Sequence, residues 1–498
     1  MARVAIIGLD GAPFDVISSL AREGGLGSFR KLLEKGVSGV LRSTIPPVSP
    51  VAWPSISTGL NPGKHGVFGF VRRGRRLYSS MSIRGRAIWD LLALAGKRSL
   101  CVNVPFTYPP YRVRGAIISG PPCPEEKPPT YPPALAKEVE ELGYRIDINL
   151  PGESFTGLGE KEFIEDCLSV TKARAEAVLN LAERIEWDLL YAVFTTLDRV
   201  QHVFFGRSLP GSPLYDQDGR RALLSYYRLL DEVVGKLLSE LADDTFFIFV
   251  SDHGFEPLFR FVSLRDFVSD FLAGKGLRNP FYEAAIHLIS RLGLMRLAGR
   301  LLDRLGLASS ASRKAGGGFE CGMGFIYSDR PAQELGELAD FLSRVRDEKG
   351  HRIFERIYRR EEVYWGPRLE EAPDLILVPR TGYEVRGMMP ERFKDVEPVE
   401  GMIYKTGTHM GLMALRGFIA MIGPGVRGGA RLDASVYDVA PTVLHLLGLP
   451  VLEEMDGEVL VGAFEEGSDP ASRPVRKIRL GAREKVALRI RKLKRALQ

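Results

Sequence analysis

Two patterns of apolar residues alternate along the chain. Short, nearly continuous runs rich in β-branched and aromatic residues predict buried strands. Longer segments with an apolar residue every three or four positions predict amphipathic helices. The strands are predicted over residues 4–9, 189–195, 245–250, 375–378 and 418–422, and the clearest helices over 162–186 and 221–241. This alternation predicts an α/β fold in which helices sandwich a central, mostly parallel sheet.

Three segments depart from this pattern. Residues 257–318 are Leu- and Arg-rich with helical spacing and end in a Gly-rich loop, so we expect a helical insertion that caps a site. The Pro-rich residues 105–135 suggest a long surface excursion. We therefore expect one main domain over residues 1–470, with the 257–318 insertion inside it, and a separate tail over 471–498.

The tail carries the chain's positive charge. The whole sequence has 68 basic and 62 acidic residues, a net charge of +6. Residues 471–498 hold eleven basic residues and one acid, which leaves the preceding 470 residues at −4. Apolar residues recur at helical spacing within the tail, as in a basic amphipathic helix. We expect this helix either to dock on a protein surface or to bind an anionic membrane surface or nucleic acid.

Composition limits the class of protein. Hydrophobic residues make up 45% of the chain and charged residues 26%, enough apolar material for a large core. The four cysteines lie far apart without a C-x-x-C pair, so a reducing compartment suits them better than a disulfide framework. The N-terminus lacks a signal-type apolar region, and there is no apolar run of eighteen residues. We expect a cytoplasmic protein, peripheral to a membrane if the tail binds one.

Acidic residues and histidines follow several predicted strands. Asp10 follows the first strand, Asp252 and His253 follow the strand over 245–250, and Asp198 follows the strand over 189–195. The carboxyl ends of strands are where α/β folds build their sites. His202 stands four residues after Asp198, so the two side chains share a face if a helix begins there. Carboxylates with imidazoles favour zinc or manganese.

One further segment carries a more specific signal. Residues 58–66 read T-G-L-N-P-G-K-H-G, and Ser49 stands nine residues before Thr58. With these residues and the strand-end aspartates and histidines, the chain resembles the alkaline phosphatase superfamily, most closely its type I phosphodiesterase/nucleotide pyrophosphatase family. The resemblance extends from Asp10 to residues 437–442. It implies an alkaline-phosphatase-like fold.

The resemblance also implies a mechanism and a ligand set. Ser49 would be the nucleophile and would form a phosphoseryl intermediate on a phosphate-ester substrate, such as a nucleotide. Two divalent metal ions would assist, most simply Zn²⁺, with Mn²⁺ as the alternative. The implied ligands are Asp10, Ser49, Asp252 and His253 for one ion, and Asp198, His202 and His409 for the other.

The chain departs from the family pattern at one position. Nucleotide pyrophosphatases usually carry an Asn twenty-one residues after the nucleophile, where its amide contacts a phosphate oxygen. That position is Phe70 here. The candidate substrate contacts are therefore Phe70 itself, Lys64 and Lys405. This departure weakens the prediction of a nucleotide substrate more than it weakens the prediction of the reaction type.

Related chemistries remain as alternatives. A phosphomonoesterase, a phosphomutase or a phosphotransferase would reuse the same ligand set. A formylglycine sulfatase is excluded, because its signature needs Pro and Arg where this chain has Val51 and Trp53. Residues 59–65 differ from a P-loop in spacing and end in His. An alternative of another class is a protein that acts through its basic tail on an anionic surface.

Overall fold

The computed structural model describes residues 2–73, 76–83, 87–125, 127–148, 158–241, 244–276, 318–479 and 481. Its centre is a nine-stranded sheet in which β18 and β7 run antiparallel to their neighbours and the other strands are parallel. The strand order is β19 (Ala434–Ser435), β2 (Val37–Arg42), β18 (Arg416–Ile422), β9 (Thr245–Val250), β1 (Arg3–Leu9), β8 (Leu189–Phe194), β5 (Ser99–Val104), β6 (Gly115–Ser119) and β7 (Thr130–Tyr131).

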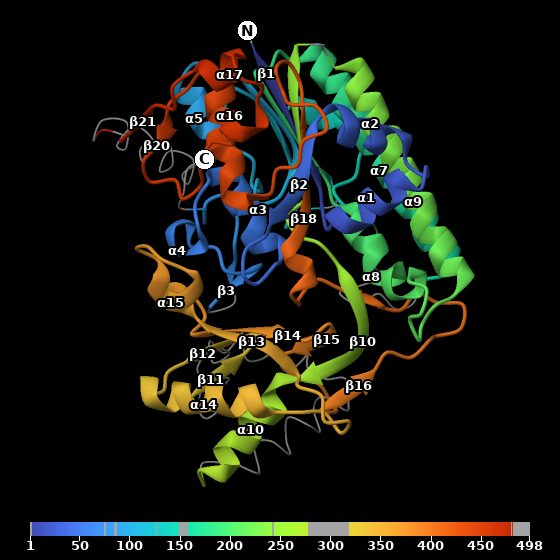
Figure 1. The fold of residues 1–498 in the computed structure, drawn as a ribbon, viewed down its shortest axis with the longest axis vertical. Coiled ribbons are helices and arrows are strands. Elements are labelled where there is room, and N and C mark those ends of the chain that lie inside the picture. The colour runs from blue at the N-terminus through green and yellow to red at the C-terminus, as the bar shows by residue number, and fades with distance from the viewer. Residues whose placement is uncertain are drawn as a thin grey trace.

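Helices cover both faces of this sheet (Figure 1). Successive residues of β1 point to opposite faces, so Ala5 and Ile7 join one core while Val4 and Ile6 join the other. The helices that contribute to the first core are α1 (Phe14–Arg22), α2 (Gly27–Lys35), α6 (Leu135–Glu141), α7 (Glu160–Arg184), α8 (Thr196–Ser208) and α9 (Gln217–Glu240). Those of the second are α3 (Ser49–Thr58), α5 (Ile88–Leu94) and α16 (Val439–Leu446). The predicted sandwich of helices around a mostly parallel sheet is confirmed.

Both long predicted helices exist, with shifted ends. α9 begins four residues before the predicted start at residue 221, because Asp216 caps it by accepting a hydrogen bond from the backbone N–H of Gly219. Apolar periodicity misses such a start, since the first turn is polar. Among the described helices, none combines the length and the apolar character needed to cross a bilayer.

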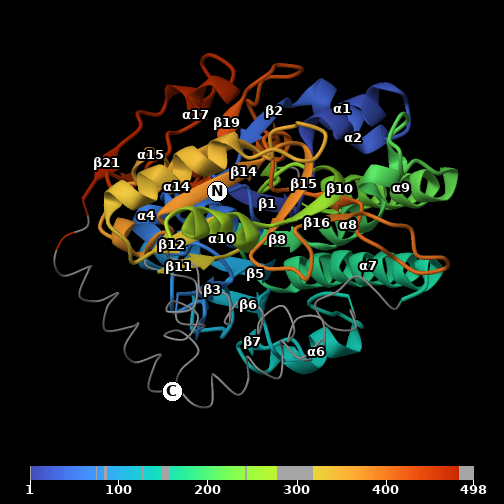
Figure 2. The same cartoon turned by 90° about the horizontal axis from the view of Figure 1, so that it is seen from below.

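A smaller unit lies beyond the carboxyl edge of the central sheet (Figures 1 and 2). It has its own hydrophobic core, to which α10 (Leu264–Gly274) and α14 (Ala332–Arg344) contribute. One of its sheets joins β15 (Gly382–Arg386), β10 (Glu256–Ser263), β16 (Phe393–Asp395) and β17 (Gly407–Thr408). The other joins β11 (Phe319–Cys321), β12 (Phe325–Ser328), β14 (Leu375–Pro379) and β13 (Phe354–Arg359).

Three segment predictions need correction. Residues 257–263, expected to start the helical insertion, form most of strand β10, because Leu258 and Val262 alternate with half-buried Phe residues. The strand over 375–378 exists as β14 but lies in the smaller unit, since a local apolar run does not say which sheet it joins. The excursion over 105–135 contains β6, a buried strand of the central sheet. Residues 277–317 lie outside the described part, so the insertion stays a prediction.

The predicted tail begins inside the folded body. α17 (Asp469–Ser472) spans the predicted boundary at residue 470, and β21 (Lys477–Ile478) pairs in parallel with β20 (Val451–Leu452). The boundary at residue 470, drawn from charge, is therefore not a structural boundary. The basic helix expected beyond residue 485 lies outside the described residues, and its partner stays a prediction.

A polar turn fixes the end of α3. Gly59 and Gly66 have φ of 68° and 79°, a conformation that favours glycine, and Asn61 caps α4 (Pro62–His65) through the N–H of Gly63. His65 is fully buried, accepts from the backbone N–H of Val67 at Nδ1 and lies 3.0 Å from the Ser55 hydroxyl at Nε2. The motif over residues 58–66 is thus the structural support of the helix that begins with Ser49.

We expect His65→Gln to destabilise the protein by about 1–3 kcal/mol at pH 7, because the buried Val67 N–H and Ser55 hydroxyl lose the ring nitrogens that they contact. Burial lowers the pKa of His65 from 6.5 to about 3. The unfolded chain therefore binds the extra proton first, and wild-type stability falls as pH drops from 6.5 towards 3. The stability of the variant lacks this dependence on pH, so the difference in unfolding free energy between wild type and variant should be smaller at pH 5 than at pH 7. Urea unfolding at both pH values checks this, and a constant gap would contradict it.

Candidate functional site

The seven predicted ligands gather at the carboxyl edge of the central sheet. They come from segments far apart in the sequence: Asp10 follows β1, Ser49 starts α3, Asp198 and His202 lie on α8, Asp252 and His253 follow β9, and His409 follows β17. Because α8 begins at Thr196, Asp198 and His202 stand one turn apart on one face, as the spacing predicts. All are buried or partly buried.

The first cluster centres on the Ser49 hydroxyl. Its Oγ lies 3.2 Å from Asp10 Oδ1 and 3.1 Å from His253 Nε2. Asp252 Oδ2 is 3.3 Å from the same imidazole nitrogen, and its Oδ1 accepts a hydrogen bond from the backbone N–H of Gly11. Asp10, Asp252 and His253 each offer a ligand atom within 4.8 Å of the others. The cluster brings together the residues predicted for the first ion, and their role as ligands stays a prediction.

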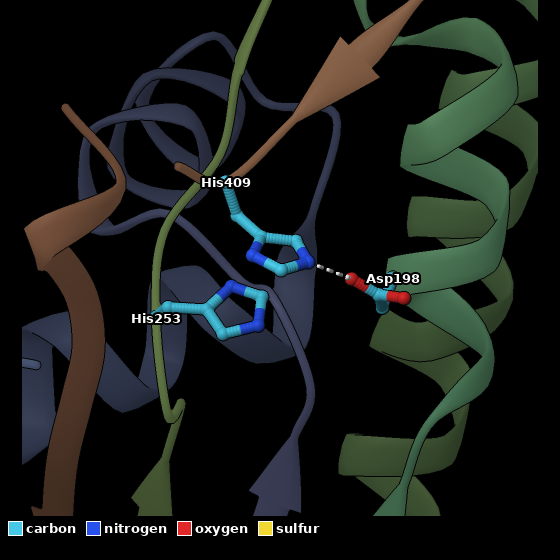
Figure 3. Close-up of side chains that lie close together, drawn as sticks. All are labelled: Asp198, His253 and His409. Carbon is cyan, nitrogen blue, oxygen red and sulfur yellow. Dashed lines mark ion pairs between the residues drawn. The ribbon is translucent and has the colours of Figure 1, made fainter. Parts of the chain in front are cut away.

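The second cluster centres on Asp198 Oδ1. The Nε2 atoms of His202 and His409 lie 3.5 and 3.7 Å from it. Figure 3 shows the His409 ring above the His253 ring, with the Asp198 carboxylate to their right, and the two rings stack with their centroids 4.1 Å apart. Asp198, His253 and His409 also offer ligand atoms within 4.8 Å of one another. His253 therefore borders both clusters, where the family pattern assigns it to one ion only.

All three imidazoles are held in the same way. Nδ1 of His202, His253 and His409 contacts a backbone carbonyl oxygen, that of Gly407, Gly254 and Pro47, at 2.9, 2.9 and 3.1 Å. A proton on Nδ1 satisfies this contact and leaves the Nε2 lone pair facing the carboxylates. Fixing one ring nitrogen so that the other can bind is the usual support of a metal-ligating histidine.

The electrostatics favour bound cations. Burial raises the pKa of Asp10 well above its ordinary value, and the charges of Asp252 and Asp198 raise it further. Burial also raises the pKa of Asp252, and it lowers the pKa of His202 and His409 far below the usual range. Asp198 Oδ1 and Asp252 Oδ2 accept no hydrogen bond of ordinary geometry within the described residues. Divalent cations would supply the missing countercharge and bind the neutral imidazoles, so the residues fit the predicted metals.

The sequence did not reveal the role of Trp53. Its indole N–H donates to Asp10 Oδ2 at 3.1 Å, which leaves Oδ1 for Ser49. Gly8 makes room for this ring, since a Cβ at residue 8 would lie 2.5 Å from the indole. The available signal was the spacing, because Trp53 stands one helical turn after Ser49.

Arg199 and Asp147 were also missed. The Arg199 guanidinium donates to Asp147 Oδ2 through Nε and Nη2, at 3.2 and 2.8 Å, and to Asp198 Oδ2 through Nη1, at 3.1 Å. Arg199 is adjacent to a predicted ligand, which was a usable signal. Asp147 belongs to a distant segment that no local pattern links to the site.

The three candidate substrate contacts have other neighbours. The Lys64 ammonium pairs with Asp456 at 2.6 Å, and that of Lys405 pairs with Glu384 at 2.6 Å. Lys405 is close enough to the second cluster for its charge to lower the pKa of His202 and His409. Phe70 is 47% exposed and stacks on Phe106 at 6.4 Å. Their contact with a substrate stays a prediction.

Comparisons with known proteins identify the family and the fold of the chain. The model of the type I phosphodiesterase/nucleotide pyrophosphatase family matches residues 4–401. No curated protein matches the chain by sequence. Solved structures of murine and human ectonucleotide pyrophosphatase/phosphodiesterase 5 are similar, each with a TM-score of 0.52. The murine protein is 14% identical, with 90% of this chain and 95% of that chain covered; the human protein is 13% identical, with 94% and 100% covered. An inactive murine form, also 14% identical with a TM-score of 0.52 and with 90% and 96% covered, was solved with AMP. At these identities the structures show a shared fold.

Proposed function

The chain belongs to the type I phosphodiesterase/nucleotide pyrophosphatase family, and from this premise we propose that it is a metal-dependent phosphodiesterase with Ser49 as nucleophile. The observation that carries the proposal is the position of the Ser49 hydroxyl. It stands within 3.2 Å of both Asp10 and His253, in a cluster of buried carboxylates and imidazoles that needs countercharge.

The site residues fall into two sets of metal ligands. Asp10, Asp252 and His253, with the Ser49 oxygen, would hold one divalent ion, and Asp198, His202 and His409 the other, with zinc or manganese suiting this donor set. Such ions, when bound, lower the pKa of an oxygen ligand and neutralise charge on a phosphate. Ser49 is the first residue of α3, so the positive end of the helix dipole further favours a negatively charged serine oxygen.

The reaction proceeds in two displacements at phosphorus. The Ser49 oxygen forms a bond to phosphorus while the bond from phosphorus to the leaving oxygen breaks; the serine proton is lost to solvent, and the departing alkoxide takes a proton from solvent to become the alcohol. Water then cleaves the phosphoseryl ester and restores the serine. Trp53 and the backbone N–H of Gly11 hold the two carboxylates that flank the nucleophile, so the site is arranged before substrate arrives.

The substrate class follows from the family and the local surface. A nucleotide or another small phosphate ester suits the site, and the AMP complex of the murine relative supports a nucleoside phosphate. Phe70, where relatives carry an amide, offers an exposed ring stacked on Phe106. An apolar ring at this place favours a substrate with an aromatic or apolar group near the phosphate.

We expect the zinc-loaded protein to hydrolyse bis-p-nitrophenyl phosphate faster than p-nitrophenyl phosphate, since family members cleave diesters. EDTA should abolish both activities, and Zn²⁺ or Mn²⁺ should restore them. Release of p-nitrophenol, followed at matched substrate concentrations, measures the preference. A faster monoester reaction would favour the phosphomonoesterase alternative. Absence of both activities after loading with either metal would refute the hydrolase proposal.

A further inference from the structure

The proposed reaction requires a group that binds the nonbridging oxygens of the phosphate. Phe70 cannot donate a hydrogen bond, Lys64 is paired with Asp456, and Lys405 is paired with a buried glutamate. We propose that Arg199 contacts a nonbridging phosphoryl oxygen of the substrate, and that Asp147 is the residue that positions it. The inference rests on the function proposed above and adds a substrate-binding residue to it.

The Arg199 guanidinium has more N–H donors than it uses within the described residues. An arginine carries five N–H groups. Among the described residues, those of Arg199 make three hydrogen bonds, two to Asp147 Oδ2 and one to Asp198 Oδ2. Two N–H groups are left, and 28% of the side chain is exposed. Arg199 is therefore anchored on one side and accessible on the other, which is the arrangement needed to bind an anion.

The position of the group points to the reacting phosphate. Asp198 binds Arg199 through Oδ2 and faces His202 and His409 through Oδ1, at 3.5 and 3.7 Å. The guanidinium is thus separated from the metal-binding atoms by the width of one carboxylate. Its positive charge also reaches Asp10, where it opposes the rise in pKa caused by burial. A phosphate held between the two clusters would lie beside this charge.

Asp147 is itself held rigidly. Arg174 is completely buried and donates to the carbonyl oxygens of Arg145 and Ile146, and it also donates to Thr195 Oγ1 at the end of β8. This fixes the segment before Asp147 against the sheet. Burial alone would raise the pKa of Asp147, but the charge and hydrogen bonds of Arg199 outweigh it and lower the pKa. The pair is therefore ionised and oriented before any substrate binds.

The competing explanation is that Arg199 only orients Asp198 as a metal ligand. Two readouts separate the roles: binding of inorganic phosphate to the zinc-loaded protein by calorimetry, and zinc content by mass spectrometry. Arg199→Met should weaken phosphate binding roughly tenfold or more, as expected for a lost charge-assisted hydrogen bond, with zinc content unchanged. Arg199→Lys should recover part of the affinity, because lysine keeps the positive charge but lacks the planar, two-pronged set of guanidinium donors. Asp147→Asn should weaken binding less than Arg199→Met.

Arg221→Met is the matched control, since Arg221 is on α9, is 73% exposed and, within the described part of the chain, bonds only to Gln217 and Asp218 of the same helix. Phosphate affinity of Arg199→Met within twofold of this control would overturn the inference, and so would a loss of zinc that parallels the loss of affinity. Failure of wild-type protein to bind phosphate would also overturn it. If phosphate binding depends on Arg199 but no ester is hydrolysed, the proposed function fails while the contact stands.

Discussion

Ser49→Ala is expected to reduce phosphodiester hydrolysis by about 10⁴-fold or more, the loss typical of removing a covalent nucleophile. The variant should keep its fold, because within the described residues the Ser49 hydroxyl bonds to Asp10 and His253, and its removal leaves the packing of α3 intact. It should also keep most of its metal, since three stronger ligands remain in that cluster. Initial rates with bis-p-nitrophenyl phosphate at saturating zinc measure the effect.

The control for this variant lies on the same helix. The hydroxyl of Ser57 is buried and contacts Tyr191 at 3.4 Å, on the side of the second core. Ser57→Ala should hydrolyse the diester within about twofold of wild type, as expected for a buried polar group outside the site. Ser49→Ala with more than a tenth of wild-type activity would mean that another group attacks phosphorus.

Asp252→Asn is expected to have opposite effects on the metal-free and metal-loaded proteins. Asp252 is fully buried, with Asp10 close enough for their charges to interact, and the pKa of both is raised. A buried acid with a raised pKa favours folding at low pH, and this contribution is lost as pH rises above the pKa it has in the unfolded chain. Removing the charge should therefore raise the unfolding free energy of metal-free protein at pH 8 by about 1–3 kcal/mol.

The same substitution removes a metal ligand. With zinc supplied, Asp252→Asn should bind one ion fewer, lose the stabilisation that binding gives the native state, and hydrolyse the diester at least about 10³-fold more slowly. Thermal unfolding with EDTA and with zinc, at pH 8, shows both effects. Asp218→Asn, whose side chain is 78% exposed, controls for loss of a carboxylate. A variant destabilised equally in both conditions would show that Asp252 is a structural residue only.

The sequence predicted the site better than it predicted the surroundings. Strand ends and helical spacing pointed to five of the candidates, because parallel strands present their carboxyl ends at one edge: Asp10, Asp198, His202, Asp252 and His253. The resemblance to the family added Ser49 and His409. The partners of these residues were not predictable. Asp147 reaches Arg199 across 52 positions, and the carbonyl of Pro47 reaches His409 across 362. Such contacts depend on the tertiary fold and leave no local pattern.

The same limit explains the errors in the fold. An apolar run predicts a buried strand but not its sheet, so the strand over 375–378 could not be assigned to the smaller unit. Residues 257–263 carry apolar side chains at spacings that suit a helix or a strand. They form a strand because their backbone pairs with β15. The charge of the tail gave a boundary at 470, although β21 beyond it pairs with β20.

The stereochemical course of hydrolysis tests the central claim most directly. Each in-line displacement inverts the configuration at phosphorus, so attack by Ser49 followed by water gives retention, whereas direct attack by water gives inversion. A phosphorothioate diester of known configuration, hydrolysed in ¹⁸O-labelled water by the zinc-loaded protein, yields a chiral thiophosphate that ³¹P NMR can assign. The two-step mechanism through Ser49 predicts retention. Inversion would contradict it.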